Sequence, residues 1–391
     1  RMLPSERDQN AMGVDADGKV IVIKIANAAE ARAALEFQVA LLEHVAKRDL
    51  RLGVPRTVVS VDGAPLVALQ GEGGVHLVRA LTYLPGVPLA QITKDAGVFR
   101  ALGRQLGRLS AALTDFDHPA ARRPDFLWNL DNAEAALAWK DEISDTRTRE
   151  IVEAFCAEQL APLRARSRSL RDAVLHQDAN DHNVVLIPGA PPRISGFIDF
   201  GDAVRGRQVN ELAVALAYAA MGTSQPVEAL TSVTGGYASS FQLHDDELDV
   251  LFELTQLRLI QSVCISHHRA RRFPENTEYL EISQRPAQAL LAQFAELNRD
   301  EVTNRLRLAA GASPRRIPAQ ATRSADLAAR RRERVAPSLS VAYREPLTIV
   351  WGQGAYLFDD TVRPFLDLVN NVAHVGHCHP RVVAALSSQA A

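Results

Sequence analysis

Two short polar stretches contain the residues whose types and spacing could do chemistry. Residues 176–183 include Asp178 and Asn183, and residues 198–202 include Asp199. An apolar run follows the first stretch, and the second begins with an isoleucine, so the two read as the ends of a strand-turn-strand. This arrangement places a carboxylate, an amide and a second carboxylate around one turn.

Phosphoryl transfer requires this set of side chains. A carboxylate orients the attacking hydroxyl and accepts its proton, while an amide oxygen and a second carboxylate hold Mg²⁺ on the nucleotide phosphates. Asp178 is therefore the candidate base, and Asn183 and Asp199 are the candidate Mg²⁺ ligands. Asp and Asn in turns often only cap the backbone, and for any one of these residues alone that reading stands beside the catalytic one.

The elements that must position these residues differ between the two ends of the chain. Residues 19–25 are β-branched and predict a strand from which Lys24 projects, and residues 28–45 have apolar side chains at helical spacing. With further strands predicted at 58–61, 66–70 and 76–84, the first part forms a small sheet with one helix. The later part is Ala/Leu-rich, and its period predicts helices at 98–113, 132–139, 147–165, 211–221, 245–267 and 277–297.

Composition limits the function classes. The 391 residues are 47% apolar and 23% charged, which is typical of globular chains with more than one core. A formal charge of -2 and 6% aromatic residues argue against nucleic acid as a partner, and no apolar run reaches the ~18 residues of a membrane span. Three widely spaced cysteines predict neither disulfides nor a zinc site. We therefore expect a cytoplasmic protein with no nucleic-acid or membrane partner.

The pattern His176-x-Asp178-x4-Asn183 followed by Ile198-Asp199-Phe200 resembles the aminoglycoside phosphotransferase and choline kinase superfamily. The resemblance covers roughly residues 3–300. It implies an α+β, bilobal, protein-kinase-like fold with a small β-rich N-lobe at 1–84 and a larger helical C-lobe at 85–300. It also implies ATP and Mg²⁺ as cofactors. Gln177 departs from the family pattern, which has Gly or Asn at that position, with Gly the usual residue.

The resemblance assigns further residues to the nucleotide. Lys24 is the counterpart of the lysine that pairs with the α- and β-phosphates, and a helix carboxylate normally holds that lysine. Glu36 is the expected partner, with Gln38 as the alternative if the alignment slips by two positions. Three smaller assignments follow: Ser5 and Asn10 in the loop over the phosphates, and Tyr83 with Leu84 in the hinge that meets adenine.

Within the superfamily, residues 5–10, 176–183 and 266–274 look most like the hydroxylysine kinase branch. The implied substrate is a small amino alcohol carrying an ammonium group and a carboxylate, which need acidic and arginine partners respectively. Sequence offers four such side chains without placing them, and the arginines near residue 270 also fit a solvated helix end. The four are Asp181, Asp202, Arg205 and Arg271.

The remainder of the chain changes character. Residues 301–339 form an Arg-rich predicted linker. Residues 340–391, with Asn-Asn-Val-Ala-His-Val-Gly-His-Cys-His-Pro at 370–380, resemble the start of a class III aminotransferase, in the branch that contains phospholyases. This implies a kinase fused to a pyridoxal-phosphate (PLP) enzyme, with PLP bound only in a longer chain that holds the complete aminotransferase domain, and a homodimer formed through that domain. The alternative is that the kinase-like part is a catalytically weak nucleotide-binding regulatory module of the aminotransferase.

Overall fold

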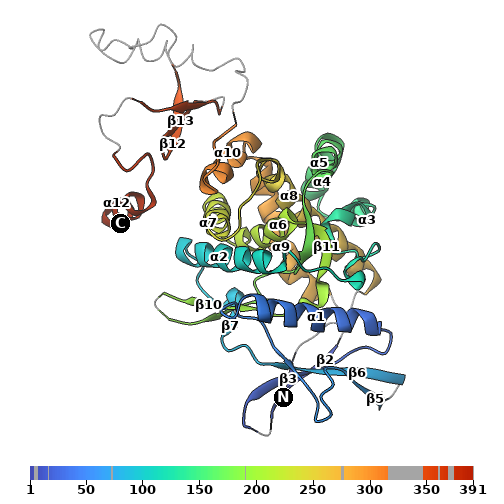
Figure 1. Ribbon diagram of the computed structural model, residues 1–391. Helices are drawn as coiled ribbons and strands as arrows, with labels where there is room; N and C mark the ends of the chain where they lie inside the picture. The colour runs from blue at the N-terminus through green and yellow to red at the C-terminus, as the bar shows by residue number, and fades with distance from the viewer. Residues whose placement is uncertain are drawn as a thin grey trace, which may run out of the picture. The chain divides into compact units, whose positions relative to one another are not determined.

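The computed structural model describes residues 1–3, 8–15, 17–71, 74–189, 191–273, 277–315, 347–359, 362–368 and 374–390. These residues form two compact units, Arg1–Glu296 and Leu297–Ala391. The first unit has a β-rich part followed by a larger helical part (Figure 1), so the predicted α+β, two-lobed fold is confirmed. The exact domain boundaries remain predictions, and residues 316–346 lie outside the described part.

The N-terminal lobe is an antiparallel sheet with one helix. The strand order is β1-β2-β3-β6-β4, and β5 pairs with the other part of β6. Helix α1 (Arg32–Arg48) lies between this sheet and the helical lobe and contacts α2 (Figure 1). The strands are β1 (Met2–Leu3), β2 (Gln9–Val14), β3 (Val20–Ile25), β4 (Thr57–Val58), β5 (Val67–Gly71) and β6 (Gly74–Thr82).

The register of this sheet puts three polar side chains in one row. Lys24 on β3 lies opposite Asn10 on β2 and opposite Arg79 on β6. Residues directly opposite in neighbouring strands point to the same face of a sheet. The row therefore brings an amide and two cations to one face, and both cations are buried there.

The C-terminal lobe is built mainly of helices, and α8 runs through its core with most of its side chains buried. The segment predicted as one helix at 147–165 is two helices, α4 and α5. The α-helices are α2 (Ala96–Leu113), α3 (Ala133–Leu137), α4 (Thr146–Glu158), α5 (Leu160–Ser167), α6 (Val209–Ala220), α7 (Pro226–Ala238), α8 (Asp245–Arg272) and α9 (Thr277–Ala295). Short 3₁₀ turns accompany them at Leu89–Gln91, Pro119–Ala121, Leu130–Asn132, Lys140–Glu142 and Phe200–Asp202.

Two small antiparallel sheets carry the polar stretches. β7 (Val87–Pro88), β9 (Val184–Ile187) and β10 (Arg193–Phe197) form one sheet, and β8 (Asp172–Leu175) pairs with β11 (Val204–Arg207) in the other. The β9–β10 hairpin packs directly on backbone that follows α1. A methyl group at Gly53 would lie 1.6 Å from the carbonyl oxygen of Ser195, and one at Gly196 would lie 1.9 Å from that of Gly53. Glycine at these two positions therefore fixes the hairpin against the N-terminal lobe.

The second unit contains α10 (Arg299–Ala309), a three-stranded antiparallel sheet and α12 (Pro380–Ala390). The strands are β12 (Ile349–Gln353), β13 (Tyr356–Asp359) and β14 (Pro364–Leu366), in that order across the sheet. Within this sheet Trp351 stacks on Phe358 with ring centroids 3.8 Å apart. In the part of the chain that the structure describes, no helix is long and apolar enough to cross a membrane.

Candidate active site

The β9–β10 hairpin brings the two polar stretches together. Phe197 is the register partner of Val184, so Asn183 immediately before β9 and Ile198 immediately after β10 lie side by side. The backbone N–H of Ile198 donates to the carbonyl oxygen of Asn183 at 2.9 Å. Asp199, the next residue, therefore emerges at the same end of the hairpin as Asn183, as the sequence predicted.

His176 connects the two polar stretches through hydrogen bonds between its ring and the backbone of each. Its ring is fully buried, and its Nδ1 accepts the backbone N–H of Asp178 at 3.2 Å. Nε2 must therefore carry the proton, and it donates to the carbonyl oxygen of Ile198 at 2.9 Å. Burial lowers the pKa of His176, which keeps the ring neutral and suits this tautomer.

Glu211 on α6 holds the start of the same loop. Its buried carboxylate accepts the backbone N–H groups of His176 at 2.6 Å and of Gln177 at 3.2 Å. Burial raises the pKa of Glu211 to about 7, although these two hydrogen bonds oppose the rise. Gln177 has φ = 65°, a conformation that glycine adopts easily, so the structure accommodates glutamine at a position where the family usually has glycine.

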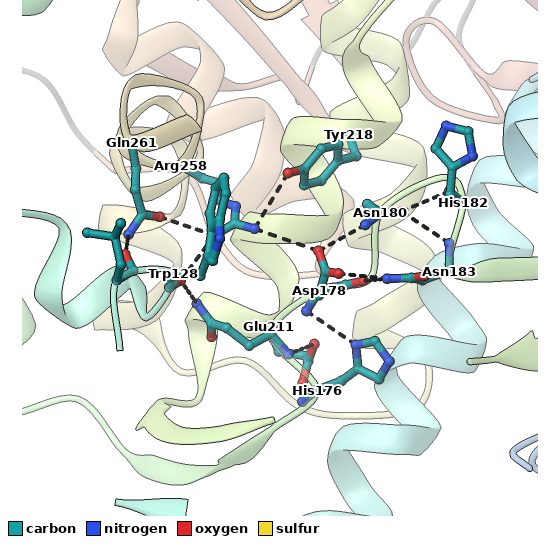
Figure 2. A network of polar contacts seen from close by, with 12 residues as sticks. Trp128, His176, Asp178, Asn180, His182, Asn183, Glu211, Tyr218, Arg258 and Gln261 are labelled. Carbon is teal, nitrogen blue, oxygen red and sulfur yellow. Dashed lines mark hydrogen bonds and ion pairs between the residues drawn. The ribbon is translucent and has the colours of Figure 1, made fainter. Parts of the chain in front are cut away.

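Asp178 lies at the centre of a polar network (Figure 2). Its carboxylate accepts Nδ2 of Asn180 at 2.9 Å and Nδ2 of Asn183 at 2.6 Å, and Nη2 of Arg258 lies 3.7 Å from Oδ1. Burial and the negative charge of Asp202 raise the pKa of Asp178 above its ordinary range, and the Arg258 charge opposes the rise. A carboxyl group with a raised pKa beside a turn is suited to exchange a proton.

Lys24 connects the two lobes. Its Nζ lies 3.1 Å from Oδ1 of Asp199. Burial would raise the pKa of Asp199, but the charge and the hydrogen bond of Lys24 outweigh it and the pKa is lowered, so the carboxylate is anionic. Asp199 also has φ = 60°, a strained conformation of the kind that concentrates at functional sites.

The expected pairing of Lys24 with Glu36 is wrong. Glu36 is exposed and forms an ion pair with Arg32 one turn earlier on α1, with Nη1 and Oε1 3.6 Å apart. Gln38, two positions on, lies on the opposite, buried face of the helix and accepts Nη2 of Arg79 at 2.9 Å. The sequence contained the signal, because 38 belongs to the apolar stripe 35-38-39-42 and 36 does not.

The hydrogen bond from Arg79 to Gln38 links the sheet to α1, in place of the expected ion pair between Lys24 and Glu36. Nη2 of Arg79 also lies 3.2 Å from Oδ2 of Asp8, which belongs to the predicted phosphate loop at residues 5–10. A pocket next to this group is lined by Lys24, Gln38, Arg79 and Asp199 together with Val39, Leu42, Pro55, Leu81 and Phe200. No pattern in the sequence singles out Arg79 or Asp8.

The other residues predicted to contact the nucleotide lie in different parts of the N-terminal lobe and the segment that follows it. Asn10 lies on β2 beside Lys24, and its Oδ1 is buried with no hydrogen-bond partner among the described residues. Tyr83 and Leu84 lie in the segment that joins β6 to β7, and Tyr83 is exposed there. Ser5 lies outside the described residues.

The donor set at the hairpin end fits a hard divalent cation. Both amide hydrogens of Asn183 are directed at Asp178, to its Oδ2 and its backbone carbonyl, which leaves the Asn183 oxygen as a ligand atom beside the Asp199 carboxylate. Amide and carboxylate oxygens are the donors that Mg²⁺ prefers. Among the described residues no group of three His, Cys, Asp or Glu side chains is arranged to hold a metal. A cation here would therefore complete its coordination with phosphate and water.

The charged side chains considered for the acceptor do not converge. Asp181 pairs with Lys94 at 3.1 Å, and Arg205 pairs with Asp117 at 3.2 Å. Arg271 is exposed near the end of α8. Among the four, Asp202 is the one whose charge acts on Asp178.

A two-lobed α+β fold with a lysine, two carboxylates and an amide gathered at its centre is the architecture of a kinase-like phosphotransferase. The chain belongs to the phosphotransferase enzyme family (APH), whose family model matches residues 5–244. Membership of this family makes the protein a small-molecule kinase and implies ATP as phosphoryl donor, typically with a divalent metal ion.

Individual proteins agree with this assignment. The chain is similar to hydroxylysine kinase of Danio rerio, with 30% identity over 318 residues that cover 78% of this chain and 88% of the relative. A microcompartment-associated aminopropanol kinase has the same fold, with a TM-score of 0.52 at 16% identity, covering 75% of this chain and 91% of that structure.

A shorter stretch of the chain has a different kind of relative. Over 62 residues, 16% of this chain, it is 50% identical to an alanine–glyoxylate aminotransferase 2-like protein of Drosophila melanogaster. The match covers 13% of that relative's length. The predicted resemblance to class III aminotransferases is confirmed for this segment.

Proposed function

We propose that the chain transfers the γ-phosphoryl group of ATP to the hydroxyl of a small amino alcohol, such as 5-hydroxylysine or ethanolamine. The observation that carries the proposal is the convergence of Asp178, Asn183 and the Lys24–Asp199 pair at the end of one hairpin. These groups supply a proton acceptor, two oxygen ligands and a phosphate-binding cation within one site.

In this proposal each side chain has one role. The acceptor oxygen bonds to the γ-phosphorus, its proton passes to the Asp178 carboxylate, and the bond from that phosphorus to the departing ADP oxygen breaks. Lys24 contacts the α- and β-phosphates. Asn183 and Asp199 would hold Mg²⁺, which would offset the charge on the phosphate oxygens.

The choice of acceptor is supported by the relatives and by the tail. The hydroxylysine kinase and the aminopropanol kinase are both named for amino alcohols. The tail supports a second step, because a hydroxyl is a poor leaving group and a phosphate ester is a good one. We propose that a PLP enzyme of the class III aminotransferase type eliminates phosphate from the product that this kinase forms. Fusion would raise the local concentration of that intermediate.

A substrate panel tests the proposal. ADP release would be measured with ATP and Mg²⁺ across amino alcohols, sugars and aminoglycosides, with EDTA as the control for the metal. We expect turnover of an amino alcohol that disappears with EDTA. Turnover of aminoglycosides alone would refute the acceptor class. If the chain binds ATP but releases no ADP with any acceptor in the panel, the result would favour the alternative of a nucleotide-binding regulatory module.

A further inference from the structure

Arg258, near the middle of α8, is a buried cation beside residues 176–183, the loop that carries Asp178 and is called the catalytic loop below. Its side chain is 2% exposed, and its guanidinium lies 4.7 Å from the ring centre of Trp128 and 5.7 Å from that of Tyr218. Nη1 donates to the carbonyl oxygen of Trp128 at 3.0 Å and to Oε1 of Gln261 at 3.1 Å. Nη2 lies 3.5 Å from the Tyr218 hydroxyl and 3.7 Å from the Asp178 carboxylate (Figure 2).

The segment around Trp128 is held from two sides. Gln261, one turn after Arg258, donates through Nε2 to the carbonyl oxygens of Leu127 at 2.8 Å and Asn129 at 3.2 Å. The side chain of Gln177 donates to the same Trp128 oxygen that Arg258 contacts, at 3.3 Å. Three successive carbonyls are thus tied to α8, and the middle one is also tied to the residue before Asp178.

Burying an arginine such as Arg258 costs folding free energy, which suggests that its position has a function. Its Nε is buried with no hydrogen-bond partner in the part of the chain that the structure describes. An apolar side chain of similar size would avoid that cost, because replacing buried charges by packed apolar groups is often neutral or stabilising. Nη1 is occupied by two protein acceptors, and Nη2 faces the Tyr218 hydroxyl and the Asp178 carboxylate.

The contacts of Asp178 show what the arginine does. Asn180 and Asn183 each donate to one oxygen of the carboxylate, and Arg258 approaches Oδ1 from α8. Nearby Asp199 and Asp202 repel the carboxylate, whereas Arg258 attracts it. Because Gln177 and Arg258 share one carbonyl, a shift of the arginine would also reach the backbone next to Asp178.

We propose that Arg258 is a positioning residue: it fixes the Asp178 carboxylate toward the acceptor hydroxyl, directly through Nη2 and indirectly through the Trp128 carbonyl that it shares with Gln177. This inference rests on the proposed kinase function. It also gives Gln177 a task that glycine could not perform, since its amide anchors the loop while its backbone keeps the left-handed conformation.

The test compares Arg258→Met with Arg166→Met in the full chain. Arg166 on α5 pairs with the buried Glu253 of α8 at 2.7 Å, so its loss disturbs the same helix away from the loop. For Arg258→Met we expect kcat to fall about 100-fold, the scale of a misplaced catalytic group, with the Kd for ATP within about two-fold of wild type. In an Asp178→Asn background, the same substitution should cause no further fall in kcat. Arg166→Met should keep kcat within about three-fold of wild type, since its partner lies outside the site.

Arg258→Lys guards against a folding defect in the methionine variant. It keeps the charge but loses the planar fork, and we expect about a ten-fold loss of kcat at an unchanged melting temperature. The inference is overturned if Arg258→Met or a folded Arg258→Lys keeps wild-type kcat, or if the loss is as large without Asp178. It is also overturned if ATP binding falls in parallel. A wild-type enzyme that forms no ADP with any acceptor would instead refute the proposed function, and this inference with it.

Discussion

Glu211 should make the stability of the catalytic loop depend on pH, with a sign opposite to that of an ordinary salt-bridged carboxylate. Burial raises its pKa from 4.5 to about 7 in the folded protein. Between these values the folded state binds more protons than the unfolded state, so stability falls as pH rises. From pH 5 to pH 8 the loss attributable to this group is about 2.5 kcal/mol, obtained by integrating the two titrations.

Replacing Glu211 by Gln removes the titration while keeping one oxygen, which can accept one of the two backbone N–H groups. Between pH 5 and pH 8, we expect the free energy of unfolding of Glu211→Gln to fall by about 2.5 kcal/mol less than that of the wild type. Urea unfolding followed by tryptophan fluorescence and far-UV circular dichroism at the two pH values measures this difference. Glu228→Gln, at an exposed position on α7, is the control and should keep the wild-type slope. Parallel pH profiles for wild type and Glu211→Gln would refute the reasoning.

Three further predictions concern the nucleotide side of the site. Lys24→Met should lower kcat/KM for ATP about 100-fold or more, because it removes a charge-assisted phosphate contact, and steady-state kinetics would show the loss. Asp199→Asn should raise the Mg²⁺ concentration needed for half-maximal ADP release, because it removes the charged ligand, and a metal titration checks this; an unchanged titration would reject the ligand assignment. Arg79→Met should raise KM for ATP about ten-fold by removing the Arg79 contact to Asp8 in the predicted phosphate loop, whereas Glu36→Gln on the exposed face should leave KM unchanged. Equal effects of Arg79→Met and Glu36→Gln would contradict the assignment of Arg79, and not Glu36, to the link between the sheet and α1.

The part of the site that lies within one hairpin could be predicted from the sequence. Asp178, Asn183 and Asp199 are close along the chain, and an antiparallel pair of strands needs only local pairing to bring their ends together. The contact between Lys24 and Asp199 spans 175 positions and was not predicted, because the family resemblance assigned both residues to the nucleotide site but paired Lys24 with Glu36. No local pattern could have joined these two residues.

Other features escaped because their cause is tertiary. Helix α7 was not predicted, since Thr-Ser-Val-Thr-Gly-Gly at 231–236 has weak helix propensity. Its packing on α2 explains why it forms: a methyl group at Gly103 would lie 1.9 Å from the Val233 oxygen, and one at Gly236 would lie 2.1 Å from the Arg100 oxygen. Glycines that weaken the isolated helix allow the close contact that stabilises it in the fold.

The network around Asp178 was also missed, although one signal was present. Arg258 stands in the run Leu-Thr-Gln-Leu-Arg-Leu-Ile at 254–260, and an arginine among residues destined for the core requires a buried partner. Its partners lie 130 positions away at Trp128 and 80 positions away at Asp178, so the sequence could indicate the need but not the identity. Glu211 offered no comparable signal, because an acidic residue in the first turn of a helix is common.

The central claim is that Asp178 accepts the proton of an amino alcohol during phosphoryl transfer from ATP. The most direct measurement compares wild type with Asp178→Asn, following the phosphorylated amino alcohol by ³¹P NMR and ATP binding by calorimetry. The account predicts that kcat falls at least about 1,000-fold while the Kd for ATP stays within about two-fold, as expected for loss of a general base. A variant that binds ATP normally and still forms the product at a rate within about ten-fold of wild type would contradict it.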